Sequence, residues 1–176
     1  IEKMRLETNG TISTLNTGGS VFLGTGAGAN DDFSDNRNVF VGSGAGEQNA
    51  TGYHNTAVGD SALFTNTASD FNTAIGNNTL FFNTTGNQNV AVGSKALEAN
   101  TTGSFNTSVG TLSLPNNTIG NFNVGVGVNA LFLNTTGEEN TAIGTASLLF
   151  NSTGNQNTAL GRAAMQNNTT GNNNTT

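Results

Sequence analysis

A serine and a histidine are the residues of this chain that could carry out nucleophilic chemistry. Ser61 lies in the segment Gly-Asp-Ser-Ala-Leu at 59–63, and His54 is the only histidine. A serine becomes a nucleophile when a nearby base accepts its proton and a third group orients that base. The sequence supplies His54 alone as a partner, and the segments 17 and 34 residues further on read Gly-Asn-Asn and Gly-Ser-Lys. We therefore interpret 59–63 as a structural corner and predict that the protein is not an enzyme.

Clustered oxygen ligands occur in the segment Asn-Asp-Asp-Phe-Ser-Asp-Asn at 30–36. Carboxylate and amide oxygens are the ligands that Ca²⁺ prefers in proteins. The acidic residues Asp31, Asp32 and Asp35 lack the spacing of a known calcium loop. A bound cation near them and a solvated insertion are both open interpretations, of which the spacing favours the insertion. We expect no cofactor.

Two glycine-rich segments have the composition of phosphate-binding loops. They read Gly-Thr-Gly-Ala-Gly at 24–28 and Gly-Ser-Gly-Ala-Gly at 42–46. Neither contains the lysine, or has the strand-loop-helix setting, that nucleotide binding requires. We interpret both as tight corners.

The elements that position these residues follow from a repeat of 17 residues. Asparagine recurs at this interval from Asn38 to Asn174, and glycine follows four residues after each of the first eight asparagines. Repeats of constant length fold as stacks of equivalent layers. The segment 20–28 is an earlier copy of 38–46 at an offset of 18, which predicts one inserted residue between 30 and 37.

The low charge content agrees with stacked layers. Charged residues make up 9% of the chain, against roughly 25% in an ordinary soluble domain. Like charges in one column would lie about 4.8 Å apart and repel each other. From Asn38 onward no column carries a charge in two successive repeats, and Glu47 and Glu98 share a column three repeats apart.

The net charge limits the partners of the protein. It is −6 with five basic residues, so the basic surface of a nucleic-acid-binding protein is missing. No basic amphipathic stretch suits a membrane surface, and no apolar run approaches the roughly 20 residues of a membrane span. We expect neither nucleic-acid binding nor membrane insertion. The chain has no cysteine, which excludes disulfides and thiolate metal sites.

Two apolar columns run through the repeat. The leucine column holds Leu63, Leu80, Leu97, Leu114, Leu131, Leu148 and Met165. The aliphatic column favours a short strand in each layer and holds Val41, Val58, Ile75, Val92, Val109, Val126, Ile143 and Leu160. Two glycines per repeat and abundant asparagine and threonine argue against helical repeats, and a single proline excludes collagen. We predict an all-β fold, a β-solenoid with one 17-residue coil per repeat and both columns inside.

Columns of asparagine and glycine are expected to shape the coil. Stacked asparagines can hydrogen-bond amide to amide, which sets the register and adds stability; the alternative is that asparagine only tolerates turns. The first asparagine column includes Asn55, Asn72, Asn89, Asn106, Asn123, Asn140 and Asn157, and the second includes Asn66, Asn83, Asn100, Asn117, Asn134 and Asn151. We expect corners with positive φ at Gly59, Gly76, Gly93, Gly110, Gly127, Gly144 and Gly161, and at a second glycine column, Gly86, Gly103, Gly120, Gly137, Gly154 and Gly171.

Aromatic residues that follow the leucine column are the predicted contact surface between copies of the chain. They include Phe64, Phe81, Phe82, Phe132 and Phe150. If the interior of the coil is full, these rings face outward, and an aromatic stripe on a rod favours lateral packing. We predict a parallel homo-oligomer, most simply a trimer around the fibre axis. The alternative is a broader coil that takes the rings into its own core.

The first 19 residues do not follow the repeat. We expect residues 1–19 to be an N-terminal cap or junction, with strand candidates at 4–7 and 11–13, and residues 20–176 to be the solenoid. We expect both to belong to a longer chain.

Units such as Asn-Thr-Ala-Ile-Gly at 72–76, followed by Asn-Thr-Thr-Gly at 83–86, resemble the repeat regions of bacterial and phage tail-fibre-like surface proteins. Those regions often precede an endosialidase-type intramolecular chaperone. The layers are more distantly similar to the heads of trimeric autotransporter adhesins, which use a shorter unit. The resemblance implies a trimeric fibre that is extracellular, on a cell surface or on a virion, and it transfers no catalytic residue.

Three functions are weighed. The first is a non-catalytic structural or adhesive fibre or shaft of a tail fibre, surface appendage or extracellular filament, with end-to-end assembly and a cell-surface or glycan receptor as partners. The second is ice binding through threonine columns, one with Thr56, Thr73, Thr107, Thr141 and Thr158 and another with Thr84, Thr101, Thr135 and Thr169. The third, a carbohydrate-degrading solenoid, needs paired carboxylates, and Asp60 and Asp70 lie at different corners. The repeat favours the fibre.

Overall fold

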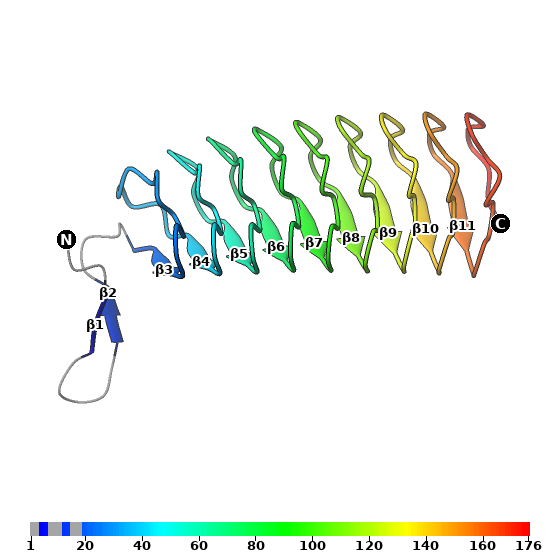
Figure 1. The fold of residues 1–176 in the computed structure, drawn as a ribbon. Coiled ribbons are helices and arrows are strands. Elements are labelled where there is room, and N and C mark those ends of the chain that lie inside the picture. The colour runs from blue at the N-terminus through cyan, green and yellow to red at the C-terminus, as the bar shows by residue number, and fades with distance from the viewer. Residues whose placement is uncertain (1–3, 7–11, 15–18) are drawn as a thin grey trace.

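The computed structural model of the chain describes residues 4–6, 12–14 and 19–176. Its main feature is a parallel sheet of nine three-residue strands, one per coil, in which every strand pairs with the strand of the next coil (Figure 1). The strands are β3 (Val21–Leu23), β4 (Val39–Val41), β5 (Thr56–Val58), β6 (Thr73–Ile75), β7 (Val90–Val92), β8 (Thr107–Val109), β9 (Val124–Val126), β10 (Thr141–Ile143) and β11 (Thr158–Leu160). The predicted all-β solenoid with coils of about 17 residues is confirmed.

Two further strands precede the solenoid. β1 (Met4–Leu6) and β2 (Ile12–Thr14) pair antiparallel, with Arg5 opposite Ser13. They fall on the two strand candidates of the N-terminal segment. No part of the described chain forms a helix that is long and apolar enough to cross a membrane.

The register of the sheet follows the sequence repeat. Thr73 lies opposite Thr56, and the same 17-residue step connects each pair of neighbours from β4 to β11. Between β3 and β4 the step is 18, since Val21 lies opposite Val39. Backbone bonds between neighbouring coils change from a 17-residue offset at Asn30 to an 18-residue offset at Asn36, so the extra residue lies in the predicted segment.

The core of each coil is narrow. On the sheet side only the middle residue of each strand is buried, as in the inner strand column, Phe40, Ala57, Ala74, Ala91, Ser108, Gly125, Ala142 and Ala159. Across the coil from these residues lies the leucine column, which is fully buried from Leu63 to Leu148. Small residues such as Ala62 and Ala96 precede the leucines and are also buried. The predicted place of the leucine column inside the coil is confirmed.

The predicted place of the aliphatic column inside the coil is wrong. Its residues are half-buried or exposed, with Ile75 40% and Leu160 67% exposed. Successive residues of a strand point to opposite faces, so burying the middle residue turns both neighbours outward. The coil is too narrow for a branched side chain on each side, and the small middle residue takes the inner place. Valine and isoleucine therefore cover the outer face of the sheet.

The second coil replaces the Ala–Leu pair of later coils by a Phe–Gly pair. Phe40 fills the inner place of β4, and Gly46 stands where later coils have leucine. A Cβ atom on Gly46 would lie 2.5 Å from Cδ2 of Phe40. Phe22 and Gly28 repeat the exchange in the first coil, and the two phenylalanine rings stack with centroids 5.4 Å apart. The volume removed on one side of the core is returned on the other.

The corners after the strands have the positive φ that the sequence predicts. From Gly42 to Gly161 these glycines have φ between 126° and 140°, and a Cβ on Gly59 would lie 2.5 Å from the carbonyl oxygen of Gly76. The leucine column also adopts a left-handed conformation, with φ of 48° to 55°, at a cost of about 1–2 kcal/mol per residue. This conformation lets the N–H of Leu80 donate to the next coil at Ala96 (3.0 Å) while Asn78 donates to the previous coil at Asp60 (3.0 Å).

Positive φ was wrongly expected for the second glycine column. Gly86 and Gly103 lie outside the left-handed region. Glycine is required there for space, because a Cβ on Gly103 would lie 2.4 Å from Oδ1 of Asn100 and 2.5 Å from the carbonyl oxygen of Gly120. The chain passes this close because the second asparagine column is bonded to these same carbonyls.

Candidate functional site

The residues considered for nucleophilic chemistry are not brought together. Ser61 follows β5 at the corner, where its N–H donates to the carbonyl of Ser43 (2.8 Å). His54 stacks on Phe71 with ring centroids 5.1 Å apart and meets Tyr53 edge to face. Both are described residues, and no hydrogen bond joins their side chains. The described coils also contain no pocket.

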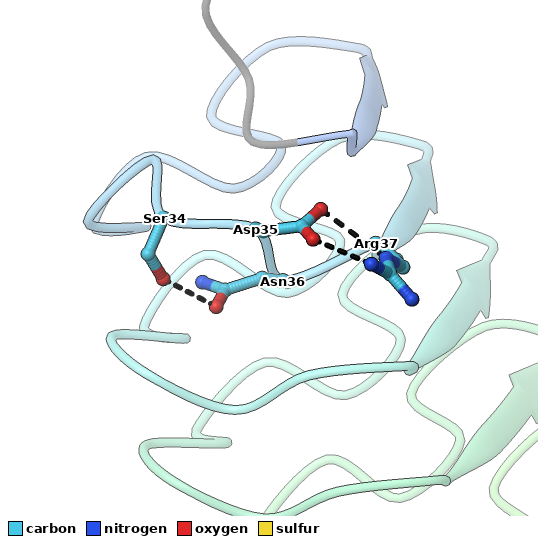
Figure 2. Close-up of polar contacts among 4 residues, drawn as sticks. All are labelled: Ser34, Asp35, Asn36 and Arg37. Atoms are coloured by element: carbon cyan, nitrogen blue, oxygen red, sulfur yellow. Dashed lines mark hydrogen bonds and ion pairs between the residues drawn. The ribbon is translucent and has the colours of Figure 1, made fainter.

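The acidic insertion turns its carboxylates toward different partners (Figure 2). Asp35 forms an exposed ion pair with Arg37, with 2.6 Å between Oδ2 and Nη2. The hydrogen bond from Arg37 lowers the pKa of Asp35, and the same bond raises the pKa of Arg37. Asp32 accepts the backbone N–H of Ser34 (3.0 Å), which lowers the pKa of Asp32. Within residues 19–176 no three acidic or histidine side chains converge to hold a metal ion.

Asp31 has a structural role that the sequence reading missed. It occupies the place of the second asparagine column in the first coil and is 3% exposed. Its Oδ2 accepts the Nδ2 groups of Asn38 and Asn49 (3.3 Å each), and its Oδ1 accepts the N–H of Phe33 (2.8 Å). A carboxylate only accepts hydrogen bonds. Asp31 therefore satisfies the amide donors with which both asparagine columns begin.

The second asparagine column forms an amide ladder along the rod. Nδ2 of Asn100 donates to Oδ1 of Asn83 (2.8 Å) and to the carbonyl of Gly103 (2.9 Å). The same pair of bonds recurs from Asn66 to Asn168, except that the Asn168 end is half-buried. Each side chain thus holds the coil before it and the turn of its own coil.

The first asparagine column binds backbone as well as side chains. Oδ1 of Asn72 accepts the backbone N–H of Asn89 (2.9 Å), and Nδ2 of Asn72 donates to the carbonyl of Gly86 (2.9 Å). From Asn106 onward the Nδ2 group also donates to Oδ1 of the preceding asparagine, as in Asn157 on Asn140 (3.0 Å). Removing one of these fully buried amides would leave partners unsatisfied in both neighbouring coils.

The outer face of the sheet is the largest continuous apolar surface of the rod. It consists of the aliphatic column, which Leu23 extends into the first coil, and the valine–threonine column on the other side of each inner residue. The valine–threonine column holds Val21, Val39, Thr56, Thr73, Val90, Thr107, Val124, Thr141 and Thr158. We call these two columns together the sheet face. All 18 of its residues are uncharged, and each is half-buried or exposed.

The phenylalanines predicted as the contact surface lie outside the core at the next corner. Phe64, Phe81 and Phe132 are half-buried, and the rings of Phe64 and Phe81 stack with centroids 5.0 Å apart. Phe82 is 49% and Phe150 39% exposed. This aromatic corner is interrupted in other coils, where Glu47, Glu98 and Pro115 take the place of the ring.

The two threonine columns differ in what their hydroxyls do. The hydroxyls of Thr84, Thr101 and Thr135 donate to the carbonyls of the next coil at 3.0 Å. The threonines of the sheet face point outward from the sheet. Only the latter could present hydroxyl groups to a partner or to ordered water.

Comparison with known proteins adds no name to this geometry. No protein family, curated protein or solved structure matches the chain.

Proposed function

We propose that the chain is a non-catalytic structural rod, a shaft segment of an extracellular, cell-surface or virion-borne fibre. The observation that supports this function best is that every coil is bonded to the next in the same way. From β4 to β11 each boundary is crossed by sheet hydrogen bonds and by both asparagine columns. Nine rungs at about 4.8 Å give a stack of roughly 40 Å. Assembly end to end and attachment to a surface receptor would extend such a rod into a fibre.

The hydrogen bonds suit a mechanical task because most of them point along the rod axis. A pulling force along the axis loads the backbone bonds of one boundary together with its buried amide bonds, such as those of Asn83 and Asn100. Buried amide bonds are shielded from competing water. Each boundary must therefore be broken as a unit before the next coil extends.

Stretching single molecules tests this function. Coils that unravel one at a time would give force peaks separated by about 55 Å, the extended length of 17 residues less one rung. Smooth extension without force peaks would contradict a mechanical role. The variant Asn100→Ala is the internal control, since it should lower the peak of its own boundary and leave the spacing unchanged.

A second candidate, ice binding, is favoured by one observation. Thr56, Thr73, Thr107 and Thr141 lie on the outer side of a regular sheet, where their spacing of about 4.8 Å per strand could order water. Valine takes four of the nine places in their column. Thermal hysteresis in a solution of the purified protein would support ice binding, and freezing at the melting point would exclude it.

A further inference from the structure

The sheet face combines apolar character with exposure along the whole rod. Its aliphatic column keeps 40% of Ile75, 37% of Val109 and 40% of Ile143 exposed. A surface column of a solvated rod has no reason to be aliphatic in every coil. Larger continuous apolar patches on soluble proteins mark interaction sites.

Charge is absent from this face and present on the others. Asp60 and Arg162 occupy the column next to the corner glycines, and Glu98 belongs to the aromatic corner. Asp70 and Glu138 share a column before the first asparagine column. Depletion of charge at the centre of a surface patch is typical of protein interfaces.

The sheet face is large enough for a stable interface. A standard complex buries about 800 Å² on each partner, which is about a tenth of the 7787 Å² that this chain exposes. Eighteen residues of average exposure in this chain supply that area. The aromatic corner is smaller because charged residues and proline interrupt it.

We propose that the sheet face packs against the sheet face of a second copy of this chain, with parallel axes and equivalent strands at the same height. The inference rests on the proposed shaft function, because a fibre with one attached end needs its copies to run in the same direction. A second copy is the occupant that matches the face at every strand, since it repeats the same rise with side chains of the same size. Three copies around one axis would satisfy the same contact, with the valine–threonine column of one copy beside the aliphatic column of the next.

The absence of cysteine from the chain makes the contact testable by cross-linking. In the proposed arrangement Val41→Cys in β4 meets its own copy, and so does Ile143→Cys in β10, so each variant alone should form disulfide-linked dimers on mild oxidation. The matched control is Thr102→Cys, which is exposed in another column and should stay unlinked. Disulfides that form only in a mixture of Val41→Cys and Ile143→Cys would show antiparallel packing and overturn the inference.

Sedimentation of the unmodified protein tests the same inference without any variant. We expect the mass of two or three chains, and Val92→Glu at the centre of the face should weaken association by about 100-fold or more, because it places like charges together. Thr102→Glu should leave the mass unchanged. A single-chain mass at all concentrations would overturn the inference. Force peaks of about 55 Å from such a monomer would leave the shaft function standing, whereas their loss would contradict that function separately.

Discussion

The Phe–Gly exchange in the second coil gives the sharpest test of how a coil fills its core. Phe40→Ala removes a fully buried ring and should lower the free energy of unfolding by about 3–5 kcal/mol. Gly46→Leu alone inserts a side chain into the space of that ring, 2.5 Å away at Cβ, and should cost about 1–3 kcal/mol or more. The two changes together recreate the Ala57–Leu63 pair of the next coil.

The double variant should therefore be far more stable than the sum of the single effects. Leucine suits the backbone, because Gly46 has φ of 57° and Leu63 has φ of 55°. Conserved volume should bring the double variant within about 1.5 kcal/mol of the parent, the remainder coming from the lost stacking of Phe22 on Phe40. The interaction energy between the two sites should then be about 3 kcal/mol.

Urea unfolding followed by far-ultraviolet circular dichroism measures this cycle, since the chain has no tryptophan to report by fluorescence. A cycle of Phe40→Ala with Thr102→Ala, an exposed residue far along the chain, is the control and should be additive within about 0.5 kcal/mol. A Phe40→Ala, Gly46→Leu double variant that is destabilised by the sum of its single effects would refute the proposed exchange of core volume.

Three further predictions concern the amide ladder and the insertion. Asn100→Asp places a buried carboxylate opposite the oxygens of Asn83 and Gly103; it should cost about 3–5 kcal/mol at pH 7, and the loss should shrink toward pH 4, because burial raises the folded-state pKa and stability then falls as pH rises. Urea midpoints at both pH values check this, and a loss independent of pH would contradict it. Gly103→Ala should cost about 1–3 kcal/mol and Gly103→Ser less, because Ser69 occupies the same column and its hydroxyl bonds the Nδ2 of Asn83 (2.8 Å); equal thermal midpoints would count against the contact. Arg37→Gln should raise the pKa of Asp35 toward its ordinary value, since the bond from Arg37 lowers it; the pair then stabilises the fold above that ordinary value and loses its effect as pH falls through the lowered pKa. An NMR titration of the Asp35 carboxyl group that is unchanged in Arg37→Gln would contradict the pairing.

The repeat made the stacking of the coils predictable. A period of 17 residues with asparagine in the same place requires Asn72 and Asn89 to lie in neighbouring layers, and the structure joins them by a hydrogen bond of 2.9 Å. Leucine in a column that otherwise has small neighbours predicts the interior, as Leu97 shows. The offset of 18 predicts the insertion before Asn38.

The faces of the strand could not be assigned from hydrophobicity alone. Val92 and Ala91 are both apolar, and the coil buries the smaller one because its width admits a leucine on one side only. A rule that large apolar residues lie inside therefore places the sheet face in the core. The alternation of side chains along a strand, combined with the small residue in every strand centre, was the signal that could have found this surface.

Backbone conformation and polar partners were predictable only in part. Leu80 adopts a left-handed φ that propensity assigns to glycine, because the bonds to both neighbouring coils require it. Gly86 keeps an ordinary φ and is glycine for lack of space. Asp31 was interpreted as a ligand in a cluster of acidic residues, although its place in the asparagine register identifies it as the start of the ladder.

A crystal structure of the purified chain tests the stacked-coil architecture most directly. The architecture predicts Asn83 and Asn100 in successive layers, with Nδ2 of Asn100 donating to Oδ1 of Asn83 at about 2.8 Å, and Val92 on the outer side of the same parallel sheet as Ile75. Electron density in which these two asparagines lie on different sides of the coil, or in which Val92 is enclosed by its own chain, would contradict it.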